Sequence, residues 1–288
     1  MNSTTIKSHA KVNIGLQVLN RRPDGYHHLH TIFQELDFHD TLTLTGKKEG
    51  CSLSSNHQTF PLDESNTCHQ AYYILKRNYP HIGGINIQVD KQIPAGGGLG
   101  GGSSNGAAVL KGLNQIYRLS LSEDDLENLA VEVGADVPFF IRGGCQLGEG
   151  IGERLTPIDV CLDGTFLLVI PPVSISTNRA YERLKKDLDS QGEKGNFADF
   201  FRRNVIPFEL FQNDFERIVI PAHPEIGEIK NTLLMQGASF ASLSGSGSTV
   251  FGIFDEESAA KAAESVFLPE YQTVLTRPHS AHNRNGIQ

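Results

Sequence analysis

A glycine-rich segment over residues 96–105, GGGLGGGSSN, constrains the fold of this chain more than any other feature. It follows alternating apolar residues at positions 85, 87 and 89, which predict a strand, and it leads into an alanine- and leucine-rich helical pattern. Six glycines in seven residues lose much conformational entropy on folding. They leave backbone N–H groups unobstructed at the start of a helix, where unpaired N–H groups and the helix dipole favour an anion. The sequence therefore predicts a loop that binds a polyphosphate.

The spacing of this loop disagrees with two common phosphate-binding motifs. A P-loop carries a lysine just before its final serine or threonine, and here Gly102 precedes Ser103. A dinucleotide-binding fold expects an acidic residue about 20 residues beyond its glycines. Acidic residues 123–125 lie near that distance, but Ser122 before them predicts the capped start of a helix. A flexible linker is a further interpretation, although linkers rarely stand between a strand and an amphipathic helix.

A second motif lies near the N-terminus. Apolar and polar residues alternate from Lys11 to Val18, which predicts a strand with Lys11 and Asn13 on the same face. Residues 22–25, RPDG, predict a tight turn, because proline presets φ and glycine accepts the unusual backbone angle. Tyr26-His27 leaves that turn and enters a second expected strand.

Two further segments each allow a structural and a functional interpretation. Residues 242–248, SLSGSGS, lie between two expected strands and form either an ordinary turn or a loop that closes over a ligand. Asp136, within GADVPFF, either caps a short helix that has Pro138 near its first turn or takes part in chemistry. The residues alone leave both questions open.

These motifs together resemble the GHMP kinases, a family named for galacto-, homoserine, mevalonate and phosphomevalonate kinases. With Pro94-Ala95 before it, the glycine loop is similar to the family pattern P-x-x-x-G-L-G-S/G-S-S. Residues 10–13, AKVN, and 22–27, RPDGYH, resemble the branch of the family that phosphorylates 4-diphosphocytidyl-2-C-methyl-D-erythritol. The D-G-Y-H segment distinguishes that branch from its homoserine and mevalonate relatives. The resemblance covers nearly the whole chain and is weakest between residues 187 and 211.

The resemblance implies ATP and Mg²⁺ as cofactors. Loop amides, lysine and Mg²⁺ would neutralise the charge of the phosphates. The sequence does not determine the ligands of Mg²⁺, for which Ser103 and Ser104 are candidates. The implied nucleotide-binding residues are Asn66, Lys91, Pro94, Ala95, Gly96, Gly97, Gly98, Leu99, Gly100, Gly101, Gly102, Ser103, Ser104, Gly245 and Gly247.

The resemblance also implies catalytic and substrate-binding residues. Asp136 would take the proton from the acceptor hydroxyl, and Lys11 beside it would keep the carboxylate ionised. A cytosine ring would stack between Tyr26 and Tyr181, with base–aromatic stacking worth about 1–3 kcal/mol per base. The remaining substrate-binding residues implied are Asn13 for the methylerythritol hydroxyls, His27 for the cytosine edge, and Thr177.

Structural interpretations of the two tyrosines remain open. Tyr26 follows a turn and is equally explained as a surface aromatic residue. Tyr181 falls on an expected helix and is equally explained as a core-facing residue. The family often has phenylalanine at that place, so Tyr181 is a mild departure from its pattern.

The pattern of elements predicts an α+β protein of two domains. Antiparallel strands with helices on one face favour this class, and the resemblance implies an N-terminal domain like ribosomal protein S5 domain 2 and a ferredoxin-like C-terminal domain. A turn-rich link over 156–164 sets the boundary, giving domains 1–157 and 158–288. Helices are expected over 67–77, 104–117, 123–133, 178–188, 224–235 and 256–267. A mobile loop is expected over 190–196, and a poorly ordered tail after Pro278.

Composition fits a small-molecule enzyme of 288 residues. The net charge of −8 and the dispersed basic residues argue against a nucleic-acid partner. No apolar run approaches the roughly 20 residues of a membrane helix, and the polar N-terminus carries no signal pattern, so a cytoplasmic protein is expected. The four cysteines lack metal-like or redox spacing and are expected to be reduced thiols. The absence of tryptophan favours a monomer or weak homodimer.

Two other functions remain compatible with the motifs. A related GHMP kinase acting on another small alcohol would keep the glycine loop and Asp136 but would not need Tyr26 and Tyr181. A nucleotide-binding sensor on the same fold is less favoured, because it has no reason to retain Lys11 and Asp136.

Overall fold

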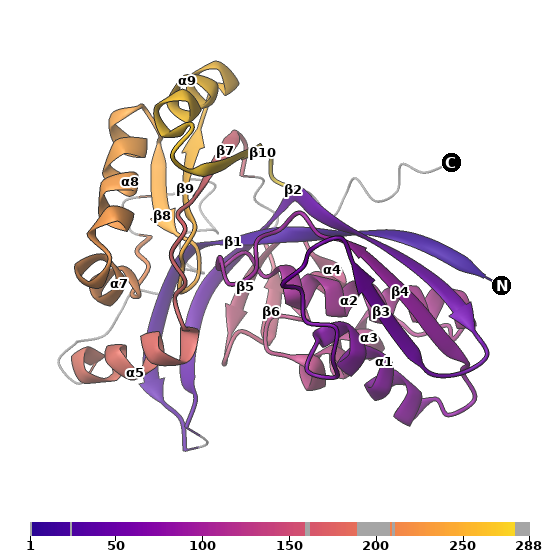
Figure 1. Ribbon diagram of the computed structural model, residues 1–288. Helices are drawn as coiled ribbons and strands as arrows, with labels where there is room; N and C mark the ends of the chain where they lie inside the picture. Colours follow the sequence, from indigo (N-terminus) through magenta and orange to yellow (C-terminus); the bar gives the residue numbers. More distant parts are fainter. Residues whose placement is uncertain (1, 24, 159–161, 189–207, 209–210, 280–288) are drawn as a thin grey trace. The chain divides into compact units, whose positions relative to one another are not determined.

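The computed structural model describes residues 2–23, 25–158, 162–188, 208 and 211–279 (Figure 1). Helices and strands both contribute heavily, which confirms the α+β class. In chain order the described elements are β1 (Ser3–Arg21), β2 (His27–Lys47), β3 (Cys51–Ser55), α1 (Thr67–Asn78), β4 (Gly84–Asp90), α2 (Gly101–Tyr117), α3 (Glu123–Val133), α4 (Phe139–Arg142), β5 (Cys145–Glu149), β6 (Arg154–Pro157), β7 (Thr165–Ile170), α5 (Thr177–Leu188), α7 (Glu216–Ala222), α8 (Pro224–Met235), β8 (Phe240–Leu243), β9 (Val250–Phe254), α9 (Glu257–Phe267) and β10 (Gln272–Thr276).

The chain divides into two compact units, and neither is a single stretch of sequence. The first unit contains Met1–Ala10, Phe38–Ala95 and Gly100–Gly143. The second unit contains Lys11–Asp37, Gly96–Leu99 and Gly144–Gln288. The long strands β1 and β2 therefore supply residues to both units. A division of the sequence at residue 157 stays a prediction.

In the first unit, helices pack on a twisted sheet. Strand β4 pairs antiparallel with the second half of β2, from Thr41 opposite Asp90 to Lys47 opposite Gly84, and β3 joins β4 in parallel. The alternation predicted for β4 is observed, because Ile85, Ile87 and Val89 are fully buried. Helix α2 lies close to the sheet, since a Cβ atom at Gly112 would fall 2.0 Å from Cδ1 of Leu44.

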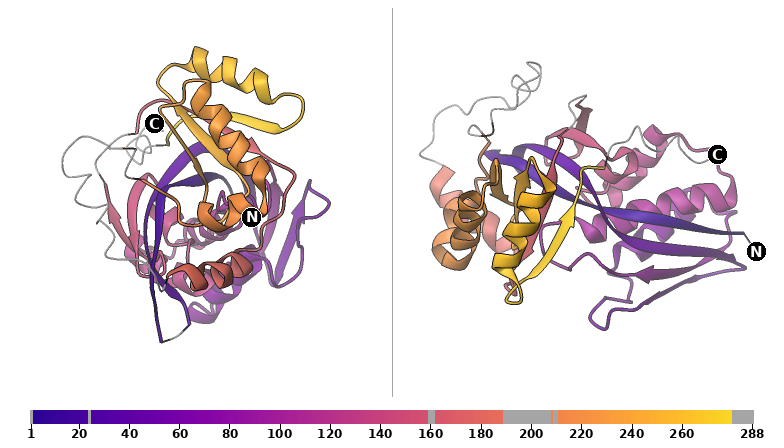
Figure 2. Two further views of the ribbon diagram at one scale, coloured as in Figure 1. Left: turned by 90° about the vertical axis from the view of Figure 1, so that its left-hand side faces the viewer. Right: turned by 90° about the horizontal axis from the view of Figure 1, so that it is seen from above.

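In the second unit, a four-stranded antiparallel sheet has the order β10-β7-β9-β8. Helices α8 and α9 run alongside it (Figure 2). All six residues of β7 are buried, as expected for a central strand covered on both faces. Helices precede β8 and follow β9, so the sheet has the order of a β-α-β-β-α-β ferredoxin-like domain.

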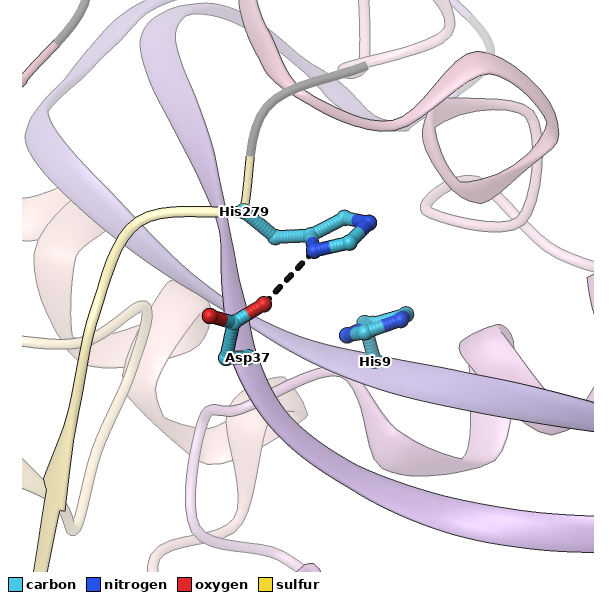
Figure 3. Close-up of side chains that lie close together, drawn as sticks. All are labelled: His9, Asp37 and His279. Atoms are coloured by element: carbon cyan, nitrogen blue, oxygen red, sulfur yellow. Dashed lines mark hydrogen bonds and ion pairs between the residues drawn. The ribbon is translucent and has the colours of Figure 1, made fainter. Parts of the chain in front are cut away.

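The last described residues of the second unit are held against β2. Pro278 forms a bridge with Leu36, and the His279 N–H donates to the Glu35 carbonyl at 2.8 Å. Nδ1 of His279 lies 2.6 Å from Oδ1 of Asp37. Figure 3 shows these two side chains pointing toward one another. The tail that was expected to be poorly ordered therefore begins with His279, which is anchored to β2. Residues 280–288 and the loop expected over 190–196 lie outside the described residues.

The bounds of the elements and the state of the cysteines can be compared with those expected from the sequence. The helix predicted over 224–235 is observed with those bounds, whereas α2 begins at Gly101 rather than at 104. The link expected over 156–164 begins inside strand β6. Cys51, Cys68 and Cys145 are free thiols, and Cys161 lies outside the described residues. None of the described helices has the length and hydropathy needed to cross a membrane.

Candidate active site

The first half of the glycine loop contacts the serine- and glycine-rich hairpin of residues 242–248 within the second unit. The Oγ of Ser244 donates to the Gly98 carbonyl at 2.8 Å, and the Thr249 N–H donates to the Gly97 carbonyl at 3.2 Å. Gly98 has a φ of +76°, and a Cβ atom there would lie 2.0 Å from the Ser244 carbonyl oxygen. Glycine is required at this position on two independent grounds.

Strand β1, which carries Lys11, also contacts the first half of the glycine loop. The Lys11 N–H donates to the Leu99 carbonyl at 3.0 Å. Its Nζ donates to Oδ1 of Asn13 at 2.6 Å, and Nδ2 of Asn13 donates to Oγ1 of Thr31 at 2.7 Å. The Lys11 ammonium also lies 5.1 Å from the centre of the Phe33 ring. Lys11 is only 4% exposed, so hydrogen bonds fix the orientation of a nearly buried cation.

The hairpin is held by residues that sequence reasoning missed. The Nδ2 of Asn213 donates to the carbonyls of Leu243 and Gly245 at 2.7 and 2.8 Å. A Cβ atom at Gly245 would lie 3.5 Å from Oδ1 of Asn13. Asn213 follows a region with no recognisable motif, so only the folded structure identifies it. Four distant parts of the sequence thus meet within the second unit: the strand of Lys11 and Asn13, the glycine loop, Asn213 and the hairpin.

The expected substrate residues of this unit are partly brought together. His27 is buried, and its ring stacks on Tyr181 with centroids 5.8 Å apart and an angle of 13°. Tyr181 also meets Phe215 edge-on at 4.9 Å and packs against the core of the unit. Tyr181 therefore contacts the core in part and also stacks on His27, and its expected stacking on a cytosine stays a prediction. Of the other expected substrate residues, Tyr26 is 61% exposed. The hydroxyl of Thr177 lies 2.8 Å from that of Ser246 in the hairpin.

The second half of the glycine loop begins helix α2 in the first unit. Gly100 is the N-cap with φ 69° and ψ 14°, and no side chain caps the helix. The first turn contains no acidic residue, and the first intrahelical bond runs from the Ser104 N–H to the Gly100 carbonyl at 2.9 Å. The preceding N–H groups are therefore without intrahelical partners at the positive end of a 17-residue helix. This end of α2 suits an anion.

Two expected nucleotide-binding residues of the first unit have structural partners. Asn66 caps α1, because its Oδ1 accepts from the Cys68 N–H at 2.9 Å while its Nδ2 donates to the Pro61 carbonyl. The Ser104 hydroxyl is buried and accepts from the Ser8 hydroxyl at 2.8 Å. Ser103 is only half-buried. Of the two serines suggested for Mg²⁺, Ser103 is the better fit.

Lys91 also has a partner in the first unit. Its Nζ lies 2.7 Å from Oδ2 of Asp40, which is fully buried, and it bonds the Ile93 carbonyl as well. Oδ1 of Asp40 accepts from the Gln92 and Ile93 N–H groups at 2.7 and 2.8 Å. Burial lowers the pKa of Lys91, and the Asp40 carboxylate opposes that shift. This ion pair fixes the backbone immediately before the glycine loop.

Asp136 lies in the turn between α3 and α4. The N-cap of α4 is Pro138, and no side chain caps this helix, so the interpretation of Asp136 as its cap is wrong. The Val137 N–H donates to the Gly134 carbonyl at 3.1 Å, which closes the turn around Asp136. Arg142 on α4 binds Glu127 on α3 at 2.6 Å and holds the two helices together. The Asp136 carboxylate is thus presented by a turn and is half-buried.

Comparison with known proteins identifies the family. The model of the GHMP kinases N terminal domain matches residues 66–144, and the model of the GHMP kinases C terminal domain matches residues 185–270. A protein from Prosthecochloris aestuarii named 4-diphosphocytidyl-2-C-methyl-D-erythritol kinase is 38% identical over 280 residues, covering 96% of this chain and 98% of its own. The chain belongs to the GHMP kinase family. Members of this family are ATP-dependent phosphotransferases.

Three further proteins are similar to this chain over nearly its whole length. A kinase of the same name from Alkaliphilus metalliredigens is 39% identical and covers 97% of this chain and 98% of its own. The crystal structure of a 4-(cytidine 5'-diphospho)-2C-methyl-D-erythritol kinase matches with a TM-score of 0.81 at 29% identity, over 96% of this chain and all of that one. Homoserine kinase from Cytophaga hutchinsonii matches with a TM-score of 0.75 at 19% identity, which shows the shared fold.

In this GHMP kinase, exchanging Lys91 for Met is expected to lower the free energy of unfolding by about 3–5 kcal/mol, because the buried Asp40 carboxylate loses its cation. Urea unfolding measures this change. The double variant D40N/K91M is expected to recover part of the loss, since it removes both charges. A stable single variant with a raised KM for ATP would instead show that Lys91 serves the nucleotide.

Proposed function

We propose that this GHMP kinase transfers the γ-phosphoryl group of ATP to the 2-hydroxyl of 4-diphosphocytidyl-2-C-methyl-D-erythritol in the non-mevalonate route to isoprenoid precursors. The products are the 2-phosphate and ADP. The observation that carries the proposal is the near full-length match to kinases named for this substrate, at 38% and 39% identity. The D-G-Y-H segment at residues 24–27 supports the same branch of the family.

The glycine loop and α2 are proposed to hold the phosphates of ATP. The N–H groups at the uncapped start of α2 provide donors and a positive potential for them. Gly98, Gly245 and Gly247 all have positive φ, which lets the loop and the hairpin approach a ligand through their backbones. The Ser103 hydroxyl is the protein oxygen that we assign to Mg²⁺, which would neutralise part of the phosphate charge.

Asp136 is proposed as the general base. Its carboxylate accepts the proton of the acceptor hydroxyl, and that oxygen forms its bond to the γ-phosphorus. The bond between the γ-phosphorus and the oxygen bridging to the β-phosphate breaks, and ADP leaves. Lys11 is proposed to stabilise negative charge on the transferred group, and its hydrogen bond to Asn13 restricts the ammonium to one direction. Phosphoryl transfer depends mostly on such positioning and charge neutralisation.

The cytidyl group is proposed to bind in the second unit at His27 and Tyr181. The ring of Tyr181 is held in place by Phe215 on one side and by His27 on another. The exposed ring of Tyr26 is proposed to cover the other face of a cytosine. His27 would read the cytosine edge, and Asn13 and Thr177 would bind the rest of the substrate.

Exchanging Tyr181 for Ala is expected to raise the KM for the cytidyl substrate roughly 5- to 150-fold, because stacking is worth about 1–3 kcal/mol per base. The KM for ATP should change less than threefold, and Tyr181→Phe should retain most of the affinity. Steady-state kinetics with each substrate varied in turn measure both values. The matched control is Tyr271→Ala, which removes another tyrosine packed against the same core. Equal changes in both KM values would contradict the stacking role.

The function is tested by ADP release in the presence of ATP and Mg²⁺. The acceptors compared are the cytidyl substrate, homoserine, mevalonate, galactose and no acceptor. Turnover confined to the cytidyl substrate would support the proposal. Turnover with another alcohol would keep the kinase and reject the roles of Tyr26, His27 and Tyr181. ATP binding without turnover on any acceptor would favour a nucleotide sensor.

A further inference from the structure

A pocket of about 380 Å³ opens between α5 and α7 in the second unit. Small-molecule sites are typically concave spaces of about 300–1,000 Å³, so this pocket has the size of a small ligand site. One part of its lining is apolar and includes Ile218 and Val219 of α7. None of the residues placed above in phosphate binding, catalysis or cytidyl binding lines it.

Two arginines give the pocket its charge. Arg179 and Arg183 lie one turn apart on α5, so both side chains project from the same face, and both line the pocket. In the described part of the chain neither guanidinium forms an ion pair. The neighbouring arginine on α7, Arg217, is by contrast paired with Asp214 at 3.7 Å. Two exposed cations that pair with no acidic group among the described residues thus line one cavity.

The other polar lining residues are two serines and a histidine. Ser174 and Ser176 precede α5, and His223 ends α7. No acidic residue is among the described residues that line the pocket. The nearest acidic group of α7, Glu216, is held by Lys230 at 2.5 Å and accepts from the Ser242 hydroxyl. Among the described residues that line the pocket, the arginines are therefore accompanied by no carboxylate, and the lining also has an apolar part.

From this arrangement we infer a second ligand site in the α5–α7 pocket, for a phosphate ester with a small apolar group. Two guanidinium groups on successive turns match the several oxygens of a phosphate better than the two oxygens of one carboxylate, because each guanidinium binds two oxygens side by side. The apolar residues opposite them would receive the organic group. This inference goes beyond the proposed function, because the reaction needs no ligand here.

Occupation of the pocket would act on α5, which also carries Thr177 and Tyr181. Thr177 contacts Ser246 of the hairpin, and Tyr181 contacts His27 and Phe215. A ligand that binds α5 and α7 together would restrict the movement of α5. It would thereby raise the affinity of a ligand that stacks on Tyr181, because α5 would already be ordered and the second ligand would lose less conformational entropy on binding.

The test is titration calorimetry of the full chain with n-butyl phosphate, inorganic phosphate and n-butanol. We expect n-butyl phosphate to bind at least tenfold more tightly than inorganic phosphate, and n-butanol to give no measurable heat. Arg179→Gln and Arg183→Gln should each weaken n-butyl phosphate about tenfold, which is the effect of losing one charge-assisted hydrogen bond. Equal affinity for phosphate and its butyl ester would overturn the assignment of an apolar subsite.

Two further variants make the result specific. Arg154→Gln removes the same charge from exposed β6 and should leave the affinity for n-butyl phosphate unchanged. Ala222→Leu places a larger side chain in the pocket while keeping both arginines, and it should abolish binding. Displacement of n-butyl phosphate by saturating ATP or cytidyl substrate would overturn the inference, as would unchanged affinity in both arginine variants. Calorimetry measures only the binding of n-butyl phosphate. The result therefore tests the α5–α7 pocket whether or not the cytidyl compound is the acceptor of the kinase.

Discussion

Exchange of Asp136 for Asn lowers kcat by an expected two to four orders of magnitude, because a positioned general base contributes about that much to a proton-transfer step. The Kd for ATP should change less than threefold, since the amide has nearly the size of the carboxylate. The N-cap position of α4 is Pro138, so the exchange removes no helix cap. Single-turnover kinetics measure the chemical step, and equilibrium titration measures the nucleotide affinity.

The matched control for this prediction is Glu132→Gln on the neighbouring helix α3. Glu132 is an exposed carboxylate that pairs with Arg77 at 2.5 Å, and its loss should leave kcat within a factor of two. A turnover of the Asp136→Asn variant within tenfold of the unaltered protein would reject Asp136 as the base. A large rise in the Kd for ATP with unchanged kcat would assign Asp136 to nucleotide binding.

Exchange of Gly98 for Ala is expected to abolish measurable ATP binding and to lower the free energy of unfolding by roughly 2–4 kcal/mol. The added Cβ atom would lie 2.0 Å from the Ser244 carbonyl oxygen, and the backbone of Gly98 has a φ of +76°. The clash forces the glycine loop away from the hairpin, and overpacking combined with an unfavourable φ has about this effect on stability. Urea unfolding and ATP titration measure the two consequences.

The variant Gly96→Ala separates the effect of the clash with Ser244 from the effect of the positive φ. Gly96 has a similar φ of +73°, but a Cβ atom there would have no neighbour within 4 Å. This control should lose only about 1–2 kcal/mol and retain ATP binding, because it has the strain without the clash. Equal losses in both variants would show that the contact with Ser244 is unimportant.

The sequence predicts those parts of the fold and site that depend on neighbouring residues. The bounds of α8 follow from Pro224 at its start and Gly237 just after its end, and the glycine loop is evident from composition alone. The loop is recognisable because its chemistry is a property of one short stretch of backbone. For the same reason the family could be identified from motifs no longer than ten residues.

Contacts between distant residues were beyond such reasoning. Asn213 holds the hairpin through bonds to residues 30 and 32 positions away, and nothing in its local sequence indicates this. Asn66 and Lys91 were expected at the nucleotide from resemblance alone, and that role stays a prediction. The helix cap formed by Asn66 and the buried ion pair of Lys91 were not foreseen. The partner of Lys91, Asp40, lies 51 positions earlier, so no spacing rule connects them.

The interleaving of the two units has a consequence for synthesis on the ribosome. Every segment of the first unit has been translated once residue 143 is added, whereas the second unit combines residues 11–37 with residues 144–288. The strand bearing Lys11 must therefore wait for the rest of its unit, which takes on the order of 10 s at about 5–20 residues per second. Until then the nascent chain lacks Ser244, so Gly98 has no hairpin to contact. A chain that ends before residue 244 therefore lacks the contacts that hold Gly97 and Gly98 of the glycine loop.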